Sequence, residues 1–308
     1  YKNKKIEKNL NYNIELLFKL AGTYKEEIKS LLLEANENLF NRDIDYNLRD
    51  FYRAVINRAL SYFHSKELCQ FLPNVIYSLA KNNWIYQPPK NNSIFNSTDW
   101  EEEAFGISNK FDFDYFSASP YRTPLLHLLN HHTETGLKLI VDIMNHSTEK
   151  YINSDRYKNP VTLDNLLPGD NAKEIKTITA NEIDISLNGK TYKEYGNEVL
   201  WCMYRGTYGA TPYLLQSLLM ALEKWLLNLA GKKDEKSLKL VEKSYSYLLS
   251  NSTTVATTSV LVSVALAYPQ TIGLLIMPVL KVKEFYSWDI VRMRYDRNPL
   301  APMDIKPV

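Results

Sequence analysis

Residues 46–63 of this 308-residue chain have the sequence YNLRDFYRAVINRALSYF. The apolar side chains recur every three or four residues, a spacing that places them on one face of an α-helix. Charged side chains such as Arg49, Asp50 and Arg53 fall between them and would face solvent. The stretch therefore predicts an amphipathic helix whose buried face is Leu48, Phe51, Tyr52, Val55, Ile56, Ala59, Leu60 and Phe63.

The same pattern recurs on both sides of this stretch. Apolar stripes of helical spacing run through residues 31–39 and 68–80, and short polar connections separate them, so antiparallel helix pairs are the expected packing. Helical spacing returns after residue 125, and residues 255–266 are apolar nearly all round, as in a fully buried helix. No fixed repeat length is visible. We expect a mainly α fold, an irregular α-solenoid-like array of antiparallel helix pairs.

One stretch interrupts the helical spacing and divides the chain. Residues 87–120 contain Pro88-Pro89, the polar run NNS and a second loop-like segment at 117–120. We therefore expect an N-terminal helical unit over residues 1–86, an irregular linker or loop over residues 87–120 packed on the helices, and a C-terminal helical unit over residues 121–308.

A second interruption indicates β-structure. Residues 177–187 alternate between apolar and polar side chains, and Asn188-Gly189 follows them. Asn-Gly readily adopts the positive φ angles of a type I′ turn, so the pattern predicts a small β-hairpin near 174–195, of two or three strands, inserted between helices.

The composition is that of a globular protein, with 45% hydrophobic and 23% charged residues. Lys and Arg number 37 against 35 Asp and Glu, so no general positive field would attract nucleic acid or an anionic membrane. The two cysteines, Cys69 and Cys202, lie in helical apolar patterns and are expected to be buried and reduced, as in a cytoplasmic protein.

No Asp, Glu, Lys or Arg occurs from residue 244 to residue 280. Hydroxyl residues and Pro269 divide this run into apolar pieces shorter than the ~20 residues that cross a bilayer, so we expect two buried helices joined at Pro269 and no membrane span. The chain starts without Met and without a signal peptide, so we expect it to be a piece of a longer protein.

Arg205, Gly206, Thr207 and Gly209 are the strongest small-ligand candidates. They precede an expected helix start at Thr211-Pro212, and glycines, a guanidinium and a helix N-terminus are the components of an anion pocket. The alternative is a tight interhelical turn in which Arg205 pairs with carbonyl groups or a carboxylate.

Histidines and acidic residues supply weaker candidates. His127 and His131 are four residues apart, a spacing that zinc ligands on a helix use, but no Glu or Cys completes a site, so we assign no metal. Asp112 and Asp114 could bind a divalent cation or simply face water. His146 is a further member of the histidine cluster.

The segment near the C-terminus interleaves aromatic residues and arginines. Such a segment can stack on bases, but neighbouring aspartates dilute its charge, so we expect it to cap the end of the array and to contact a partner protein. The candidate contact residues are Tyr286, Trp288, Arg292, Arg294 and Tyr295.

Several motifs carry a resemblance to a known family. They are FGI at 105–107 with FDFDYF at 111–116, residues 124–132 leading into 136–146, LWCMYRGT at 200–207, residues 214–227 with ALEKWL, and SNS at 250–252. Over residues 65–295 the chain resembles the helical region downstream of the NTPase module in large bacterial NACHT/STAND-type ATP-binding proteins, a group associated with defence against phage. The P-loop of that group is absent from this sequence.

The resemblance implies a sensor. In such proteins the helical region binds a foreign protein and relieves inhibition of an effector, so we expect a protein-binding sensor or scaffold segment, with no catalytic residue and no cofactor of its own. The parent protein can form an oligomer. The alternative is a hydrolase or nucleotide-processing enzyme that uses Arg205, Asp112, Asp114 and the histidines. Convergence of those residues in one pocket would distinguish the two.

Overall fold

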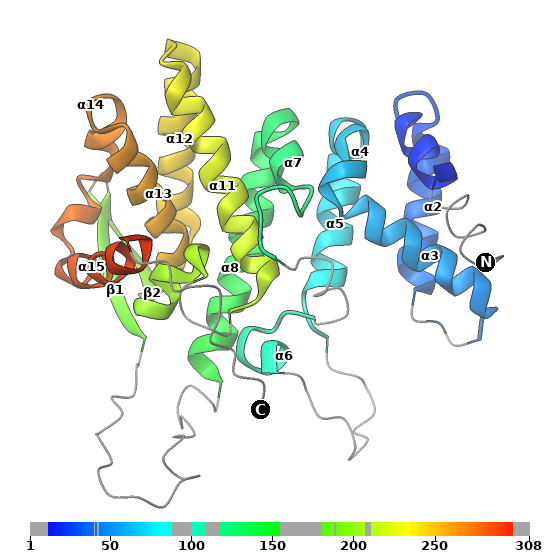
Figure 1. The fold of residues 1–308 in the computed structure, drawn as a ribbon, viewed down its shortest axis with the longest axis horizontal. Coiled ribbons are helices and arrows are strands. Elements are labelled where there is room, and N and C mark those ends of the chain that lie inside the picture. Colours follow the sequence, from blue (N-terminus) through cyan, green and yellow to red (C-terminus); the bar gives the residue numbers. More distant parts are fainter. Residues whose placement is uncertain are drawn as a thin grey trace, which may run out of the picture.

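The computed structural model describes residues 12–39, 41, 43–87, 100–108, 117–154, 180–187, 189–206 and 211–297, without the side chains of 100, 101 and 295–297. Within these residues, helices pack side by side in a row along the longest axis of the molecule, and one antiparallel β-hairpin lies toward the C-terminal end of the row (Figure 1). The predicted mainly α fold with a β-hairpin insertion is confirmed.

Short helices form the N-terminal part of the row. In chain order they are a helix over residues 12–19, α2 (Lys25–Asn38), α3 (Tyr46–Ala59), the 3-10 helix η1 (Tyr62–His64), α4 (Lys66–Phe71) and α5 (Pro73–Trp84). Helix α3 buries the predicted stripe through Tyr52, Val55 and Ile56, and the Asp45 side chain caps it by accepting from the backbone N–H groups of its first turn.

The predicted helix over 46–63 is too long at its C-terminal end. Helical dihedral angles stop at Leu60 (φ −95°, ψ 5°), and η1 follows in a different direction. Phe63 is therefore 73% exposed instead of buried, because the turn takes it off the stripe.

Three helices form the middle of the row: α6 (Trp100–Phe105), α7 (Leu125–His131) and α8 (Thr133–Asn153). Ile85, just after α5, makes an isolated antiparallel bridge with Ile107, and the Phe105 ring stacks on Tyr151 of α8 at 5.0 Å. The described residues within the predicted linker thus pack on the helices beside them.

The C-terminal part begins with the hairpin and continues with helices. Its elements are β1 (Asn181–Leu187), β2 (Lys190–Gly196), α10 (Glu198–Cys202), η4 (Met203–Arg205), α11 (Tyr213–Lys232), α12 (Glu235–Asn251), α13 (Val255–Ala267), α14 (Pro269–Ile272), η5 (Gly273–Ile276), η6 (Val279–Lys281) and α15 (Lys283–Arg297).

The predicted helix start at Thr211-Pro212 is wrong in detail. Helix α11 begins at Tyr213, and Pro212, in an extended conformation, is the residue before it. The Thr211 hydroxyl does not cap the helix; it accepts a hydrogen bond from the Gln216 side chain at 2.9 Å.

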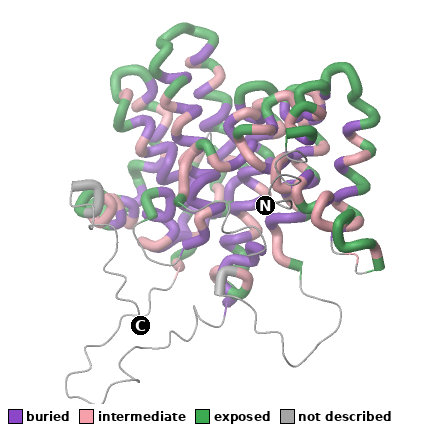
Figure 2. Tube along the Cα trace, turned by 45° about the vertical axis from the view of Figure 1, so that its right-hand side comes forward, coloured by how far each residue is buried: buried purple, intermediate pink, exposed green. Residues whose placement is uncertain are grey.

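A single apolar core runs the length of the row. The buried apolar residues form one cluster from Ile14 to Trp288, and Figure 2 shows buried segments along the whole row with exposed turns at its edges. The predicted units over 1–86 and 121–308 therefore share one core. Helix α13 is buried along nearly all its length, as predicted, and the Tyr245 hydroxyl donates to its Leu261 carbonyl at 2.8 Å.

The charge-free run contains one buried helix, α13, and not the expected two buried helices joined at Pro269. After α13 the chain turns at Pro269 into the single turn α14 and the 3-10 helix η5. In the described part of the chain, no single helix has the length and apolarity to cross a membrane; one pair of segments, Val255–Ala267 and Pro269–Ile276, meets that test jointly but is bent by 111°.

The hairpin has two strands among the described residues; residues 174–179 lie outside them. It is part of the core, since Ile183 and Ile185 of β1 are buried. The Tyr195 backbone N–H donates to the Thr253 carbonyl at 2.8 Å, which ties β2 to the residues before α13.

Gly196, the last residue of β2, permits this close approach. A Cβ atom at Gly196 would lie 2.4 Å from Cγ1 of Val255, too close for any real contact. We expect Gly196→Ala to lower the free energy of unfolding by about 1–3 kcal/mol, as overpacking does. Gly273→Ala is the matched control: its Cβ would have only an ordinary contact at 3.8 Å with Pro269, and its φ is −58°. Urea denaturation measures both, and equal losses would contradict this account.

Candidate functional site

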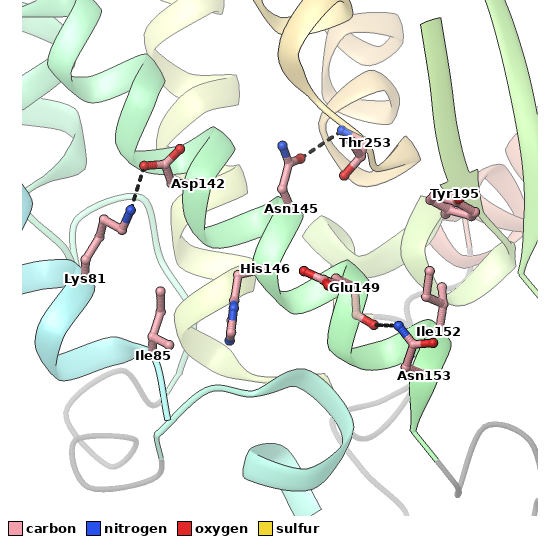
Figure 3. A pocket seen from close by; sticks show the side chains of 10 residues that line it. All are labelled: Lys81, Ile85, Asp142, Asn145, His146, Glu149, Ile152, Asn153, Tyr195 and Thr253. Atoms are coloured by element: carbon pink, nitrogen blue, oxygen red, sulfur yellow. Dashed lines mark hydrogen bonds and ion pairs between the residues drawn. The ribbon is translucent and has the colours of Figure 1, made fainter. Parts of the chain in front are cut away.

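An open groove of about 720 Å³ brings together distant parts of the described chain. Its residues come from the end of α5, from one side of α8, from β2 and from the connection between α12 and α13 (Figure 3). We call it the α5–α8 groove. The residues that line it are Lys81, Ile85, Asp142, Asn145, His146, Glu149, Ile152, Asn153, Tyr195 and Thr253.

One wall of the groove is an ionic contact between α5 and α8. The Lys81 ammonium donates to Asp142 at 2.9 Å, and the Tyr77 hydroxyl also donates to Asp142. The hydrogen bond to Asp142 raises the pKa of Lys81, and burial, followed by the Asp142 contact, raises the pKa of Tyr77. Both side chains therefore keep their protons at neutral pH, which suits a clamp between helices and not a nucleophile or a base.

Asn145 fixes the opposite side of the groove. Its Nδ2 donates to the Asn251 carbonyl at 2.9 Å, and its Oδ1 accepts from the Thr253 backbone N–H at 2.8 Å. Because Thr253 in turn accepts from the Tyr195 backbone, α8, the α12–α13 connection and β2 are joined by consecutive hydrogen bonds. The groove is thus held in shape by backbone contacts from three elements.

One charged side chain of the groove, Glu149, is left for a ligand. Glu149 is exposed and makes no ion pair within the part of the chain that the structure describes. His146 is not available in this way: its Nε2 is buried, 2.7 Å from where a Cβ atom at Gly106 would lie, and burial lowers the pKa of the imidazole while a backbone hydrogen bond with Gly106 raises it. The groove therefore offers one exposed carboxylate beside apolar Ile85 and Ile152 (Figure 3).

Glu194, which precedes Tyr195 of the groove on β2, is a buried ionisable side chain. It is fully buried on β2; its Oε1 accepts from the Thr258 hydroxyl at 2.7 Å, and its Oε2 has no partner among the described residues. Burial raises the pKa of Glu194 to about 8, so it is protonated at neutral pH. No sequence signal marked it, because the strand alternation alone does not say which face of a hairpin is buried.

The protonated Glu194 makes stability depend on pH. The folded protein holds a proton that the unfolded chain releases near pH 4.5, so stability falls as pH rises between that value and about 8. We expect the free energy of unfolding to fall by up to about 1 kcal/mol per pH unit over this range. Glu194→Gln keeps the acceptor for Thr258 and should remove that dependence.

Chemical denaturation of both proteins from pH 5 to pH 9 measures this effect, and the difference between them isolates Glu194 because the histidines are common to both. Glu182→Gln, on the exposed side of the same hairpin, is the control. Lys193 lowers the pKa of Glu182, so its contribution changes only at acid pH. Identical pH profiles for the parent protein and Glu194→Gln would contradict the buried-acid account.

Arg205, the principal sequence candidate, is held by a carboxylate. Its guanidinium donates to Glu223 of α11 at 3.1 Å and lies over the Tyr204 ring at 4.6 Å, and the Ser263 hydroxyl donates to the same Glu223 oxygen at 2.7 Å. Gly206 has a left-handed backbone (φ 65°) that turns the chain. Arg205 therefore pairs with a carboxylate beside a turn, which is the alternative to an anion pocket given in the sequence analysis.

The remaining candidates of that set, Thr207 and Gly209, lie outside the described residues. An anion pocket that includes them stays a prediction. The cation of that pocket would be Arg205, and the Arg205 guanidinium already forms an ion pair with the Glu223 carboxylate.

This contact should contribute to stability. Glu223→Ala would leave the partly buried Arg205 and Ser263 without their acceptor, and we expect it to lower the free energy of unfolding by about 1–3 kcal/mol. Lys239→Ala, which removes an exposed ion pair with Glu235, should change it by less than about 0.5 kcal/mol. Thermal or urea unfolding compares them, and a larger effect for Lys239→Ala would reverse our interpretation.

The predicted partner-binding residues near the C-terminus separate into buried and exposed groups. Trp288 is 7% exposed and packs with Phe285 on Trp201, so its assignment as a contact residue is wrong; the spacing places it on the inner face of α15. Arg292 is also turned inward, with two hydrogen bonds to Asp289, which accepts from the Trp201 indole.

The other residues of this group remain candidates. Tyr286 and Arg294 are exposed, and the Tyr286 hydroxyl donates to the Leu280 carbonyl at 2.7 Å. The Tyr295 side chain lies outside the described residues.

The residues of the enzyme alternative do not meet in one described pocket. The His127 ring stacks on Tyr62, and its Nε2 is 3.0 Å from the Tyr62 carbonyl, so that nitrogen is occupied. His146 lies in the α5–α8 groove, which neither His127 nor His131 lines. Asp112 and Asp114 are outside the described residues. Among described residues, no group of three or more His, Cys, Asp or Glu could hold a metal ion.

No known family model matches the sequence, and a search of curated proteins finds no match either.

Proposed function

We propose that this chain is a protein-binding scaffold segment whose recognition surface is the α5–α8 groove. The observation that carries the proposal is the groove itself: residues from four separate parts of the chain form one open surface, and consecutive hydrogen bonds through Asn145 and Thr253 hold it in place. A site that is already ordered loses little conformational entropy when it binds.

The chemistry of the groove suits a segment of a protein. Ile85, Ile152 and Tyr195 offer apolar and aromatic contact area, while Glu149 offers a carboxylate to backbone N–H groups or to a basic side chain. Protein interfaces combine apolar and polar groups in this way. Rows of packed helices also present long surfaces of this kind.

The resemblance to NACHT/STAND-type proteins suggests the kind of parent protein to which this segment belongs. We propose that the chain is the sensor segment of a larger, cytoplasmic, ATP-binding defence protein, with a phage protein as the candidate partner. The motif residues that carry the resemblance include Trp201 and Trp225, which are buried and pack the core. The resemblance therefore supports a shared helical architecture, and the groove supplies the support for binding. A Walker-type motif upstream in the parent reading frame is the observation that would strengthen this extension.

A substitution in the groove should remove partner capture. Glu149 is exposed, so Glu149→Arg reverses a charge in the groove without disturbing the core. We expect the tagged parent protein to retain a specific protein from infected cells, and Glu149→Arg to reduce its recovery at least tenfold, a loss that about 1.4 kcal/mol of binding energy produces. Quantitative mass spectrometry measures the recovery.

Glu242→Arg is the matched control, since Glu242 is equally charged and exposed on α12 but does not line the groove. Unchanged recovery with Glu149→Arg, or equal loss with both variants, would count against the groove as the recognition surface.

A further inference from the structure

The hairpin side of the α5–α8 groove is held on the rest of the protein by a few contacts of β2. The Tyr195 backbone N–H donates to the Thr253 carbonyl at 2.8 Å, and both residues line the groove (Figure 3). Gly196 lies close to Val255 and Trp288. A two-stranded hairpin is only marginally stable by itself, so β1 and β2 depend on this packing to stay folded. Loss of the contact between β2 and α13 would therefore alter the groove.

Glu194 places an acid within that contact. Its side chain is fully buried, and its Oε1 accepts from the Thr258 hydroxyl of α13 at 2.7 Å. Its Oε2 has no partner among the described residues. A protonated carboxyl group can occupy this position, because it is neutral and one oxygen is hydrogen-bonded. A buried carboxylate needs a cation or several donors, so the ionised side chain is strongly disfavoured here.

The elements packed on the hairpin supply no cation to Glu194. Helix α13 has no ionisable side chain, and α12 has no charged one after Lys243. The other ionisable groups around the hairpin are Tyr245 and Tyr247 of α12, Glu198 and Cys202 of α10, Asp289 and Arg292 of α15, which pair with each other, and the exposed Glu182, Asp184, Lys190 and Lys193 of the hairpin itself. Burial and the Thr258 hydrogen bond are the two influences on the pKa of Glu194, and neither is a charge.

We propose that loss of the Glu194 proton releases β2 from α13 and removes Tyr195 from its place in the α5–α8 groove, so that pH regulates the shape of the groove. The biological use of this switch rests on the proposed function, in which the groove is the recognition surface. An occupant that binds only the packed hairpin would, by linkage, strengthen the binding of the proton.

The size of the effect follows from the two protonation equilibria. Burial raises the pKa of Glu194 to about 8, and release of the hairpin returns the carboxyl group toward its ordinary pKa of 4.5. The packed state therefore binds the proton more tightly, and the equilibrium constant for release rises by up to about tenfold per pH unit between these values. Above about pH 8 the packed state ionises as well, and the constant levels off.

Amide hydrogen exchange of the purified chain, followed by mass spectrometry, measures the release directly. The reporter is the fragment that contains Tyr195, whose N–H is bonded to Thr253, and the reference is α3. Comparing the parent chain with Glu194→Gln at each pH cancels the intrinsic pH dependence of exchange. Between about pH 5.5 and about pH 7.5, protection of the reporter should fall about 100-fold more in the parent chain than in the variant.

Two further variants complete the test. Glu182→Gln is the matched control: it lies on the exposed side of the same hairpin, and Lys193 lowers the pKa of Glu182, so this variant should follow the parent chain. Thr258→Val keeps the acid and removes the hydroxyl that donates to it. That hydrogen bond lowers the pKa of Glu194, so its loss should move the levelling-off to higher pH. This shift decides the matter if Glu194→Gln does not fold.

Three results would overturn the proposal. The parent chain and Glu194→Gln could show the same pH dependence, which would exclude Glu194 as the switch. The reporter could exchange as slowly as α3 at every pH, which would mean that the hairpin leaves α13 only when the whole chain unfolds. Thr258→Val could level off at the same pH as the parent chain. The experiment uses no partner, so its failure is distinct from a failure of the groove to capture one.

Discussion

Burial around α8 joins the two halves of the row. This 21-residue helix packs against α5, α6 and α7 on one side and against α11 and α12 on the other. Apolar residues such as Leu139, Ile140 and Ile143 are buried on more than one of its faces, so the helix cannot lose either set of neighbours without exposing them. The continuous core follows from this arrangement.

The same helix determines where the groove lies. Once its apolar faces are buried, α8 retains one polar stripe at helical spacing, which contains Asp142, Asn145, His146, Glu149 and Asn153. Asp142 is used to clamp α5, and Asn145 is used to hold the connection before α13. His146 has its Nε2 buried beside Gly106, so Glu149 remains as the available charged group of the groove. The candidate site is the part of this stripe that internal contacts do not use.

The short β-hairpin contributes both to the groove and to the core. It closes one side of the groove through Tyr195 and buries Glu194 against α13. Ionising a buried carboxyl group that has a single hydrogen bond costs free energy. The packing of the hairpin is therefore coupled to the protonation of Glu194. The short strands, the tight contact at Gly196 and the hydroxyl of Thr258 together make the hairpin an integral element of the core.

The spacing of apolar and polar residues along the chain was sufficient to predict most of the secondary structure and much of the core. The spacing at 46–60, the buried run at 255–266 and Asn188-Gly189 each predicted an element that the structure contains, because helical and strand periodicity depend on neighbours within a few residues. The same pattern failed at Phe63 and at Thr211: helix α3 ends four residues before Phe63, and helix α11 begins one residue after the expected first position, Pro212.

The candidate sites depended on contacts that no local pattern contains. Arg205 was correctly expected near a helix start, yet only the folded chain brings Glu223, 18 residues away, to its guanidinium. Trp288 and Tyr286 looked equivalent in the sequence, and the packing of α15 on Trp201 buried one and exposed the other.

The sequence by itself thus determined the helices, the hairpin and the identity of most buried residues. Tertiary structure alone decided which polar side chains are used inside the protein and which face solvent, because that choice depends on partners distant along the chain.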